Sequence, residues 1–255
     1  MRFASLGSGS SGNALLVQSG ATLVLLDCGF GPAETGARLA RLGLDPGDLD
    51  AILVTHEHDD HAAGVARLAR RWGIAVYATH GTVRAMEQAQ ELPSGTVVID
   101  SHAPFAVGDL EVRPYPVPHD SREPAQFVFS DGAAALGVLT DAGEVTPHMM
   151  RVLSGLDALV LECNHDLGLL MGGPYPPHLK ERIAGRFGHL DNGAAARLVR
   201  GIDHSRLKHL VAAHLSRKNN TPELARAALA QALGCAPGWI GVATQEDGFP
   251  WREIR

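Results

Sequence analysis

The seven residues from Thr55 to His61 constrain this chain more than any other segment. They read Thr-His-Glu-His-Asp-Asp-His and directly follow a short apolar run that is typical of a buried strand. In an extended chain, residues two apart face the same way, so His56 and His58 can bind one metal ion. Asp60 and the histidine after it begin the next helix and turn toward a second position. So many polar groups bury little apolar surface and therefore contribute little to the stability of a fold. Binding a metal ion explains the segment better, so it predicts a metal site.

Short apolar runs alternate with helical patterns on both sides of this segment. Strands are expected at 2–6, 14–17, 22–26, 51–54, 74–78, 97–99, 103–107, 110–117, 126–129, 133–139, 158–162 and 207–213. Helices are expected from Pro32 to about Gly43 and at 65–72, 81–89, 145–153, 179–187, 192–201 and 222–233. The first strands resemble a meander, which favours two mixed sheets flanked by helices over one parallel, doubly wound sheet.

Two details refine this α/β (α+β) fold class. The sequence contains no linker and no low-complexity tract, so residues 1–255 are expected to form a single domain. Pro114 and Pro116 cannot donate ladder hydrogen bonds. The strand at 110–117 is therefore expected at a sheet edge, or to become irregular near its end.

The charge distribution is uneven. The chain has 22 basic and 28 acidic residues, and its net charge of −6 argues against a protein that coats nucleic acid. Residues 180–218, however, hold nine basic and three acidic side chains, a balance of +6 that leaves −12 for the remainder. Such a segment is usually a solvated surface. It faces a phosphate substrate only if reactive groups lie beside it.

The cysteines and the first residues predict a cytoplasmic protein. Cys28, Cys163 and Cys235 form no CxxC pair, so neither a disulfide framework nor a thiolate zinc site is expected. The first residues lack the apolar core of a signal peptide, and no apolar run reaches the length of a membrane span. We therefore expect no membrane partner.

The His-x-His-x-Asp-His pattern at 56–61 and several further motifs resemble those of a known group of enzymes. The chain resembles the metallo-β-lactamase-fold hydrolases, and among them the YycJ/WalJ-type bacterial enzymes. The resemblance runs from the first strand to about residue 225. The matching segments are 6–13, 55–61, His119-Asp120, Glu123-Pro124, Thr140-Asp141, 164–166, 188–190, 214–216 and 219–224. The resemblance implies a four-layer αβ/βα sandwich with a metal site at its edge.

The resemblance also implies a ligand set for two divalent metal ions. One ion would be held by His56, His58 and His119, the other by Asp60, His61 and His214, with Asp141 bridging both. His119, Asp141 and His214 each follow a predicted strand, where loops gather ligands. Nitrogen and oxygen ligands without thiolate suit Zn²⁺ or Mn²⁺, and iron also fits.

The YycJ/WalJ-type resemblance implies nuclease activity, notably 5′→3′ exonuclease action on DNA. In this reading Asp60 orients or deprotonates the attacking water, and His189 assists the leaving group as a proton donor. An alternative is a hydrolase of a small substrate, such as a cyclic phosphodiester, a thioester or a lactone, because the same metals polarise carbonyl groups. A non-catalytic nucleic-acid-binding protein is a more remote alternative.

Other polar residues are weaker candidates for substrate contact. The glycine-rich loop at 7–13 could cradle a phosphate, and residues before a helix N-terminus could bind an anion, although turns and helix caps use the same residue types. The candidates are Ser10, Ser11, Asn13, His165, Asn219 and Asn220. The remaining histidines are expected at the surface or in caps: His80, His102, His148, His178, His204 and His209.

Overall fold

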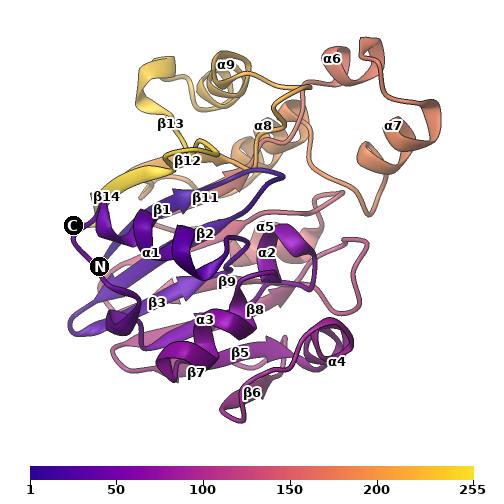
Figure 1. Cartoon of the computed structure of the whole chain (residues 1–255). Helices are drawn as coiled ribbons and strands as arrows, with labels where there is room; N and C mark the ends of the chain where they lie inside the picture. Colours follow the sequence, from indigo (N-terminus) through magenta and orange to yellow (C-terminus); the bar gives the residue numbers. More distant parts are fainter.

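The computed structural model describes residues 1–255 and contains two seven-stranded sheets (Figure 1). The strands are β1 (Arg2–Gly7), β2 (Ala14–Ser19), β3 (Thr22–Leu26), β4 (Ala51–Leu53), β5 (Ala75–Thr79), β6 (Thr96–Ile99), β7 (Phe105–Val107), β8 (Leu110–Pro116), β9 (Ala125–Ser130), β10 (Ala135–Leu139), β11 (Ala158–Glu162), β12 (His209–Ala213), β13 (Gly241–Val242) and β14 (Phe249–Glu253). The helices are α1 (Pro32–Ala40), α2 (Asp59–Ala62), α3 (Val65–Trp72), α4 (His80–Ala89), α5 (Pro147–Val152), α6 (Leu167–Gly172), α7 (Pro177–Ile183), α8 (Asn192–Gly201) and α9 (Pro222–Leu233), with short 3₁₀ turns at Pro46–Asp48 and Pro237–Trp239.

Both sheets are mixed, as the early meander indicates. The first has the order β14-β1-β2-β3-β4-β5-β6, and its strands run antiparallel up to β3 and parallel from β3 to β6. The second has the order β13-β12-β11-β10-β9-β8-β7, antiparallel from β7 to β10 and parallel from β10 to β13. Each sheet therefore has one parallel half, whose strands end at a common edge.

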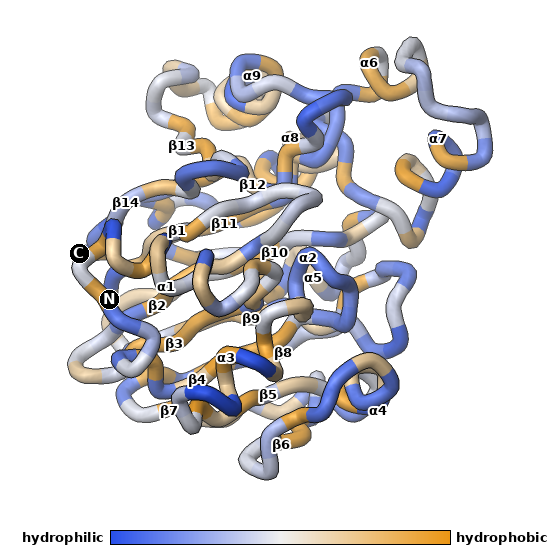
Figure 2. Tube along the Cα trace, in the orientation of Figure 1, coloured by the Kyte–Doolittle hydropathy of each residue, from blue (hydrophilic) through white to orange (hydrophobic).

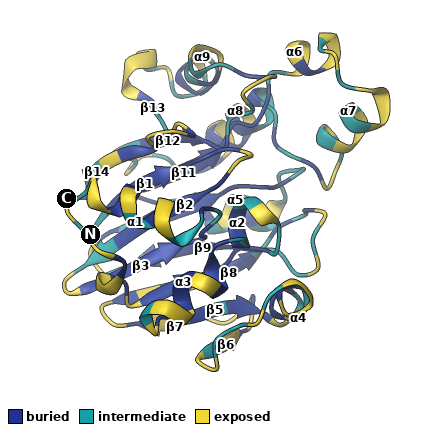
Figure 3. Cartoon of the chain, viewed as in Figure 1, coloured by how far each residue is buried: buried dark blue, intermediate teal, exposed yellow.

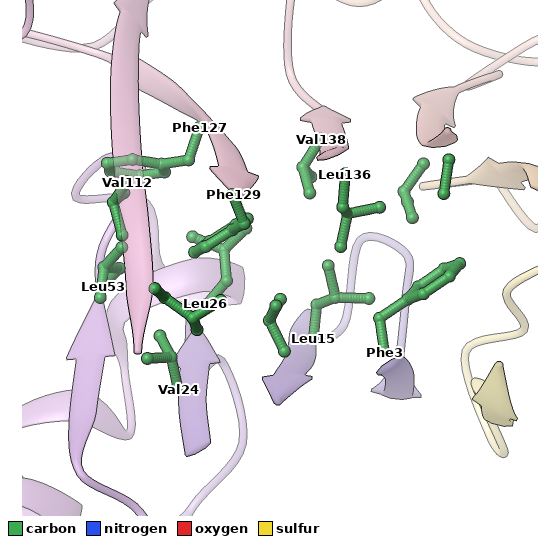
Figure 4. Close-up of a cluster of buried hydrophobic side chains, with 14 of the residues drawn as sticks. Phe3, Leu15, Val24, Leu26, Leu53, Val112, Phe127, Phe129, Leu136 and Val138 are labelled. Carbon is green, nitrogen blue, oxygen red and sulfur yellow. The ribbon is translucent and has the colours of Figure 1, made fainter. Parts of the chain in front are cut away.

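Three apolar clusters separate the four layers of the fold. The first lies between the sheets, where Phe3, Leu15 and Leu26 face Phe127 and Leu136 (Figure 4). The second packs the first sheet against α1, α3 and α4, and the third packs the second sheet against α5, α8 and α9. Apolar residues concentrate in the strands (Figure 2), and the strands are buried while the outer helix faces are exposed (Figure 3). The expected αβ/βα sandwich is confirmed.

Some elements differ from the sequence-based expectation. Helix α6 lies where neither a helix nor a strand was expected, and its N-cap is Asp166, whose side chain accepts a hydrogen bond from the backbone N–H of Leu169. The C-terminal strand β14 was not expected, because Pro250 interrupts its pattern; β14 lies at a sheet edge, where proline is tolerated. Helix α7 buries none of its residues and projects with α6 away from the sheets (Figure 1).

The prolines of β8 lie where the strand has one open side. Strand β7 pairs only with Leu110–Val112, so Pro114 and Pro116 pair with β9 alone. Strand β8 is thus second in its sheet, yet it forms a local edge over its last residues, as its prolines predict. No helix of the chain is both long enough and apolar enough to cross a membrane.

Candidate metal centre

Three histidines form the first of the two ligand groups expected from the sequence. His56 and His58 come from the loop after β4, and His119 comes from the loop after β8. Their candidate ligand atoms all lie within 4.8 Å of one another, and Nε2 of His119 is 3.3 Å from Nδ1 of His58. Nε2 of His56 is buried without a hydrogen-bond partner. An unpaired buried nitrogen aimed at two other imidazoles is the arrangement that a bound cation would satisfy.

The second group combines Asp60, His61 and His214. Oδ2 of Asp60 lies 3.2 Å from Nε2 of His214 and 3.5 Å from Nε2 of His61. Asp60 and His61 stand on α2, directly after the first group, whereas His214 follows the parallel strand β12 of the other sheet. The site therefore spans the edges of both sheets.

Asp141 lies between the two groups. Its Oδ2 is 2.9 Å from Nε2 of His61, and its Oδ1 is 3.6 Å from Nε2 of His214. It also shares a ligand cluster with His56 of the first group. Oδ2 is buried and not aligned for a hydrogen bond, despite its closeness to His61. The position of Asp141 therefore fits the bridging role expected from the sequence.

Neighbouring groups orient the imidazole rings. Nδ1 of His61 is 2.7 Å from Oδ2 of Asp27, Nδ1 of His119 is 3.0 Å from the carbonyl oxygen of Gly188, and Nδ1 of His56 is 3.0 Å from Oγ1 of Thr55. Such contacts fix the tautomer and leave Nε2 as the coordinating atom. His58 is the exception, because its Nδ1 faces His119. The donor atoms and their supporting contacts fit a pair of divalent ions.

The carboxylates of the site are held ionised. Burial alone would raise the pKa of Asp141 and Asp60, but the neighbouring His214 and His61 lower both pKa values well below their usual range. Burial would lower the pKa of His61, and the facing carboxylates instead raise it. His56 has its pKa lowered by burial and by His61. The centre thus combines anionic oxygen donors with imidazoles, as divalent cations require.

Backbone strain marks the same positions. Asp27, Asp141 and His214 have positive φ angles of 62°, 51° and 54°, and they are the only residues other than glycine that do. Each follows a strand, and each is buried at or beside the ligand cluster. Residues are held in such sparsely populated conformations mainly at functional sites. Glycine is needed at position 29, because a Cβ there would meet the carbonyl oxygen of Asp60 at 2.0 Å.

His189 is paired with Glu162, and these two residues form a further possible ligand group with Asp141 and His214. Oε1 of Glu162 lies 2.8 Å from Nδ1 of His189, and Oε2 accepts the backbone N–H groups of Ala142 and Leu190. Burial alone would lower the pKa of His189, but Glu162, and after it Asp141, raises it. Glu162 was not among the residues predicted for the site, because its position is that of the last residue of a buried strand. Its only signal is a carboxylate at the end of an otherwise apolar run.

A cavity of about 240 Å³ opens over these groups. Its lining includes Asp60, Asp141, His189 and His214. Helix α7 supplies the opposite wall through Leu179, Arg182 and Ile183. The guanidinium of Arg182 binds Asp120 at 2.7 Å, so one cation stands at the mouth of the cavity. The cavity therefore brings possible metal ligands, a cation that can bind an anion and a possible proton donor into one small space.

The structure separates the six weaker candidates for substrate contact. Ser10 lines the cavity. Asn13 is buried and binds Gly9 and Asp60, His165 is fully buried, and Asn220 binds Asn192 and the carbonyl oxygen of Cys163. Asn219 is also buried, and Ser11 donates its backbone N–H to Gln245. Only Ser10 of the six therefore borders the cavity, and the other five support the loops around it or lie in them.

The basic segment is largely tied to carboxylates. Arg182 pairs with Asp120, Arg186 with Glu144, Arg206 with Asp157 and Arg217 with Glu246. Only Arg182 among its cations borders the cavity. A continuous phosphate track along 180–218 therefore remains a prediction, with Arg182 as its one member at the site.

Comparison with known proteins places this geometry in context. Residues 22–214 match the family described as the beta-lactamase superfamily domain. Exodeoxyribonuclease YycJ of Bacillus anthracis is 38% identical over 239 residues, which cover 91% of this chain and 89% of that protein. Exodeoxyribonuclease WalJ of Streptococcus pneumoniae is 34% identical over 245 residues, which cover 94% of this chain and 91% of that protein.

A solved structure agrees on the fold. The metallo-beta-lactamase fold protein YhfI from Bacillus subtilis superposes with a TM-score of 0.76, covers 99% of both chains and shares 17% sequence identity. At that identity the likeness concerns the architecture of the two sheets and their helices.

Proposed function

The chain belongs to the β-lactamase superfamily and, within it, to the family of the YycJ and WalJ exodeoxyribonucleases, and from this membership we propose that it is a two-metal nuclease that degrades DNA from the 5′ end. One observation carries the proposal. Both ligand groups, the bridging carboxylate of Asp141 and the imidazole of His189 meet at a single cavity of about 240 Å³. Such a site supplies the components of in-line phosphodiester hydrolysis.

Seven residues would hold the ions. His56, His58 and His119 form one set, Asp60, His61 and His214 form the other, and Asp141 joins both. Zn²⁺ or Mn²⁺ suits these nitrogen and oxygen donors, and iron is a further candidate. When bound, a pair of divalent ions lowers the pKa of water and neutralises charge on the attacking and leaving oxygens of a phosphodiester.

Asp60 is the residue proposed to orient the attacking water. Its carboxylate borders the cavity and is held ionised by His61 and His214, with Oδ2 at 3.2 Å from the latter. An ionised carboxylate accepts a hydrogen bond from water and fixes its direction of attack. Asp60 therefore acts both as a ligand and as the group that positions the nucleophile.

His189 is the proposed proton donor. Its Nδ1 is bound to Glu162 at 2.8 Å, so the other ring nitrogen is free on a residue that borders the cavity. Glu162, and after it Asp141, raises the pKa of His189 and so favours the protonated ring. A protonated imidazole in this position can pass a proton to the 3′ oxygen as the ester bond breaks.

Ser10 and Arg182 are the groups proposed to hold the scissile phosphate. Arg182 presents a planar cation on α7, and Ser10 presents a hydroxyl from the loop after β1. Guanidinium groups bind phosphate oxygens through two parallel hydrogen bonds. Phosphate binding would draw Arg182 from Asp120 toward the ions.

We place the protein in the cytoplasm, where DNA is available.

A substrate panel tests the proposal. The protein is assayed with Mn²⁺ and with Zn²⁺ on 5′-phosphorylated duplex DNA, single-stranded DNA, RNA, bis(p-nitrophenyl) phosphate and a thioester. The proposal predicts turnover of DNA and of the aryl phosphate, with mononucleotides released from the 5′ end. Turnover of the thioester alone would replace the nuclease by a small-substrate hydrolase.

A further inference from the structure

A second groove lies on the outer face of the sheet that carries β8. Its volume is about 540 Å³, and none of its 13 lining residues is acidic. Three arginines, Arg113, Arg151 and Arg206, line it together with His102 and His148. In a chain whose acidic residues outnumber its basic ones by 28 to 22, such a lining is selective for anions.

The groove is formed by the loop before β7, by β8 and the start of β10, and by α5 with the loop after it. Its floor includes Pro114, in the part of β8 that lacks a partner from β7. Arg113 precedes that proline, and Arg151 reaches the groove from the last turn of α5. The open side of the strand and the end of the helix thus leave a channel between them.

The cations of the groove differ in how firmly they are held. Arg206 is bound to the buried carboxylate of Asp157 at 2.9 Å, and Arg113 approaches Glu111 at 3.6 Å. Arg151 is exposed and makes no ion pair with any residue of the chain. Arg151 can therefore bind a phosphate without breaking an existing ion pair, whereas the other two arginines already have carboxylate partners.

The groove and the metal centre lie at opposite ends of β10. Ala135 lines the groove at the beginning of β10, and Asp141 follows the end of that strand. At about 3.3 Å per residue the two positions are about 16–20 Å apart. Two residues after Asp141, the backbone at Gly143 packs against Arg186 and Gly188, and Gly188 lines the metal cavity. Helix α5 follows Asp141 in the chain and carries His148 and Arg151, which line the groove.

From this placement we propose that the groove binds the phosphate backbone of the DNA strand that extends away from the metal centre. The proposal rests on the proposed function, because it takes DNA as the substrate whose end enters the cavity. Phosphates along one strand are about 3.4 Å apart, so the span corresponds to about five or six nucleotides. Strands shorter than this reach the metal centre but not Arg113 and Arg151.

The test compares an Arg113→Gln/Arg151→Gln variant with wild type. Arg206 is left in place, because its loss would leave the buried Asp157 without its closest cation. A matched Arg70→Gln/Arg84→Gln variant removes the same charge from exposed arginines on α3 and α4. Affinity for fluorescein-labelled strands of 4 and 20 nucleotides is measured by anisotropy over a range of salt concentrations. Turnover of bis(p-nitrophenyl) phosphate and the melting temperature report on the metal centre and on folding.

We expect the groove variant to bind the 20-nucleotide strand about fivefold or more weakly, with a salt slope smaller by about 1.4. Its binding of the 4-nucleotide strand and its aryl phosphate turnover stay at the wild-type value, and the matched variant behaves as wild type. Equal affinity of groove variant and wild type for the 20-nucleotide strand would overturn the proposal. So would an equal loss in the matched variant.

Two further results separate the possible outcomes. If wild type hydrolyses the aryl phosphate but no DNA, the proposed function fails, while the anisotropy comparison still judges the groove by itself. Free inorganic phosphate presents the same anionic oxygens as the DNA backbone and is the other ligand to test. The metal-loaded protein is therefore titrated with inorganic phosphate in a calorimeter. If the groove variant loses one phosphate-binding event while its DNA affinity is unchanged, the groove binds free phosphate and the DNA assignment is overturned.

Discussion

Oε1 of Glu162 lies 2.8 Å from Nδ1 of His189, and this contact couples a fully buried carboxylate to the proposed proton donor. Glu162 ends a strand of five buried residues, so its side chain has little freedom to move. It also lies 3.6 Å from Nδ1 of His214. One carboxylate thus orients both a proposed metal ligand and the acid, which makes it a positioning residue for the reaction.

Replacing Glu162 by glutamine should separate these effects. The amide keeps the shape but removes the charge that raises the pKa of His189. Because the protonated imidazole is the active form, activity is lost as pH rises through this pKa. The alkaline limb of the pH profile should therefore move to lower pH in Glu162→Gln, with kcat about tenfold or more lower.

The control for this substitution is Glu144→Gln, which removes an exposed carboxylate paired with Arg186. Its pH profile should match that of wild type. An unmoved alkaline limb in Glu162→Gln would show that His189 is not the group that titrates.

Asp141 and His189 should fail in different ways. Asp141→Ala removes the carboxylate that contacts His61 and His214 and shares a ligand cluster with His56, so metal content and turnover should fall together, with turnover lowered more than about a thousandfold. His189→Ala should lower kcat about 10²–10⁴-fold while metal content stays at the wild-type value. Elemental analysis of both variants beside their rates decides the matter. Equal metal loss in both would make His189 a ligand instead of an acid.

Asp27 should control metal affinity through His61. Its Oδ2 lies 2.7 Å from Nδ1 of His61, and it adopts a left-handed backbone conformation that asparagine tolerates. Asp27→Asn should weaken metal binding about 10–100-fold, as measured by competition with a chromogenic chelator. The exposed Asp247→Asn serves as the control. Unchanged metal affinity in Asp27→Asn would mean that the contact does not orient the imidazole.

The cysteines should differ sharply in reactivity. Burial raises the pKa of Cys28 to about 11 and raises that of Cys163 further, whereas Cys235 is partly exposed. Because the thiolate is the reactive form, an aromatic disulfide reagent at pH 8 should modify only Cys235 in the native protein and all three cysteines in denaturant. Rapid modification of more than one native thiol would contradict the buried placement of the other two.

Sequence patterns predicted the elements and ligand groups that are formed by residues close together in the chain. Strands such as Ala158–Glu162 are largely apolar runs, and the loop after Leu53 together with the short helix α2 carries four candidate ligands within a few residues. His119, Asp141 and His214 were expected at strand ends, and the structure places them there, although their ligand roles remain predictions. The parallel strands that precede Asp141 and His214 end at the same edge of the second sheet, which brings residues distant in sequence together.

Features that depend on tertiary packing could not be predicted from the sequence in this way. Asn13 sits in a glycine-rich loop typical of phosphate binding, yet its side chain turns inward to Gly9 and Asp60. Strand β14 exists because β1 offers it a free edge. Glu162 and Asp27 gain their roles only from histidines that lie 27 and 34 residues away along the chain.

The central claim is that two metal ions at this cavity hydrolyse DNA. The most direct measurement titrates metal-free protein with Mn²⁺ or Zn²⁺ while following both bound metal and degradation of a 5′-phosphorylated DNA strand. The claim predicts that activity appears as the second equivalent binds and that Asp141→Ala never acquires it. Full DNA degradation with less than one equivalent bound would contradict it.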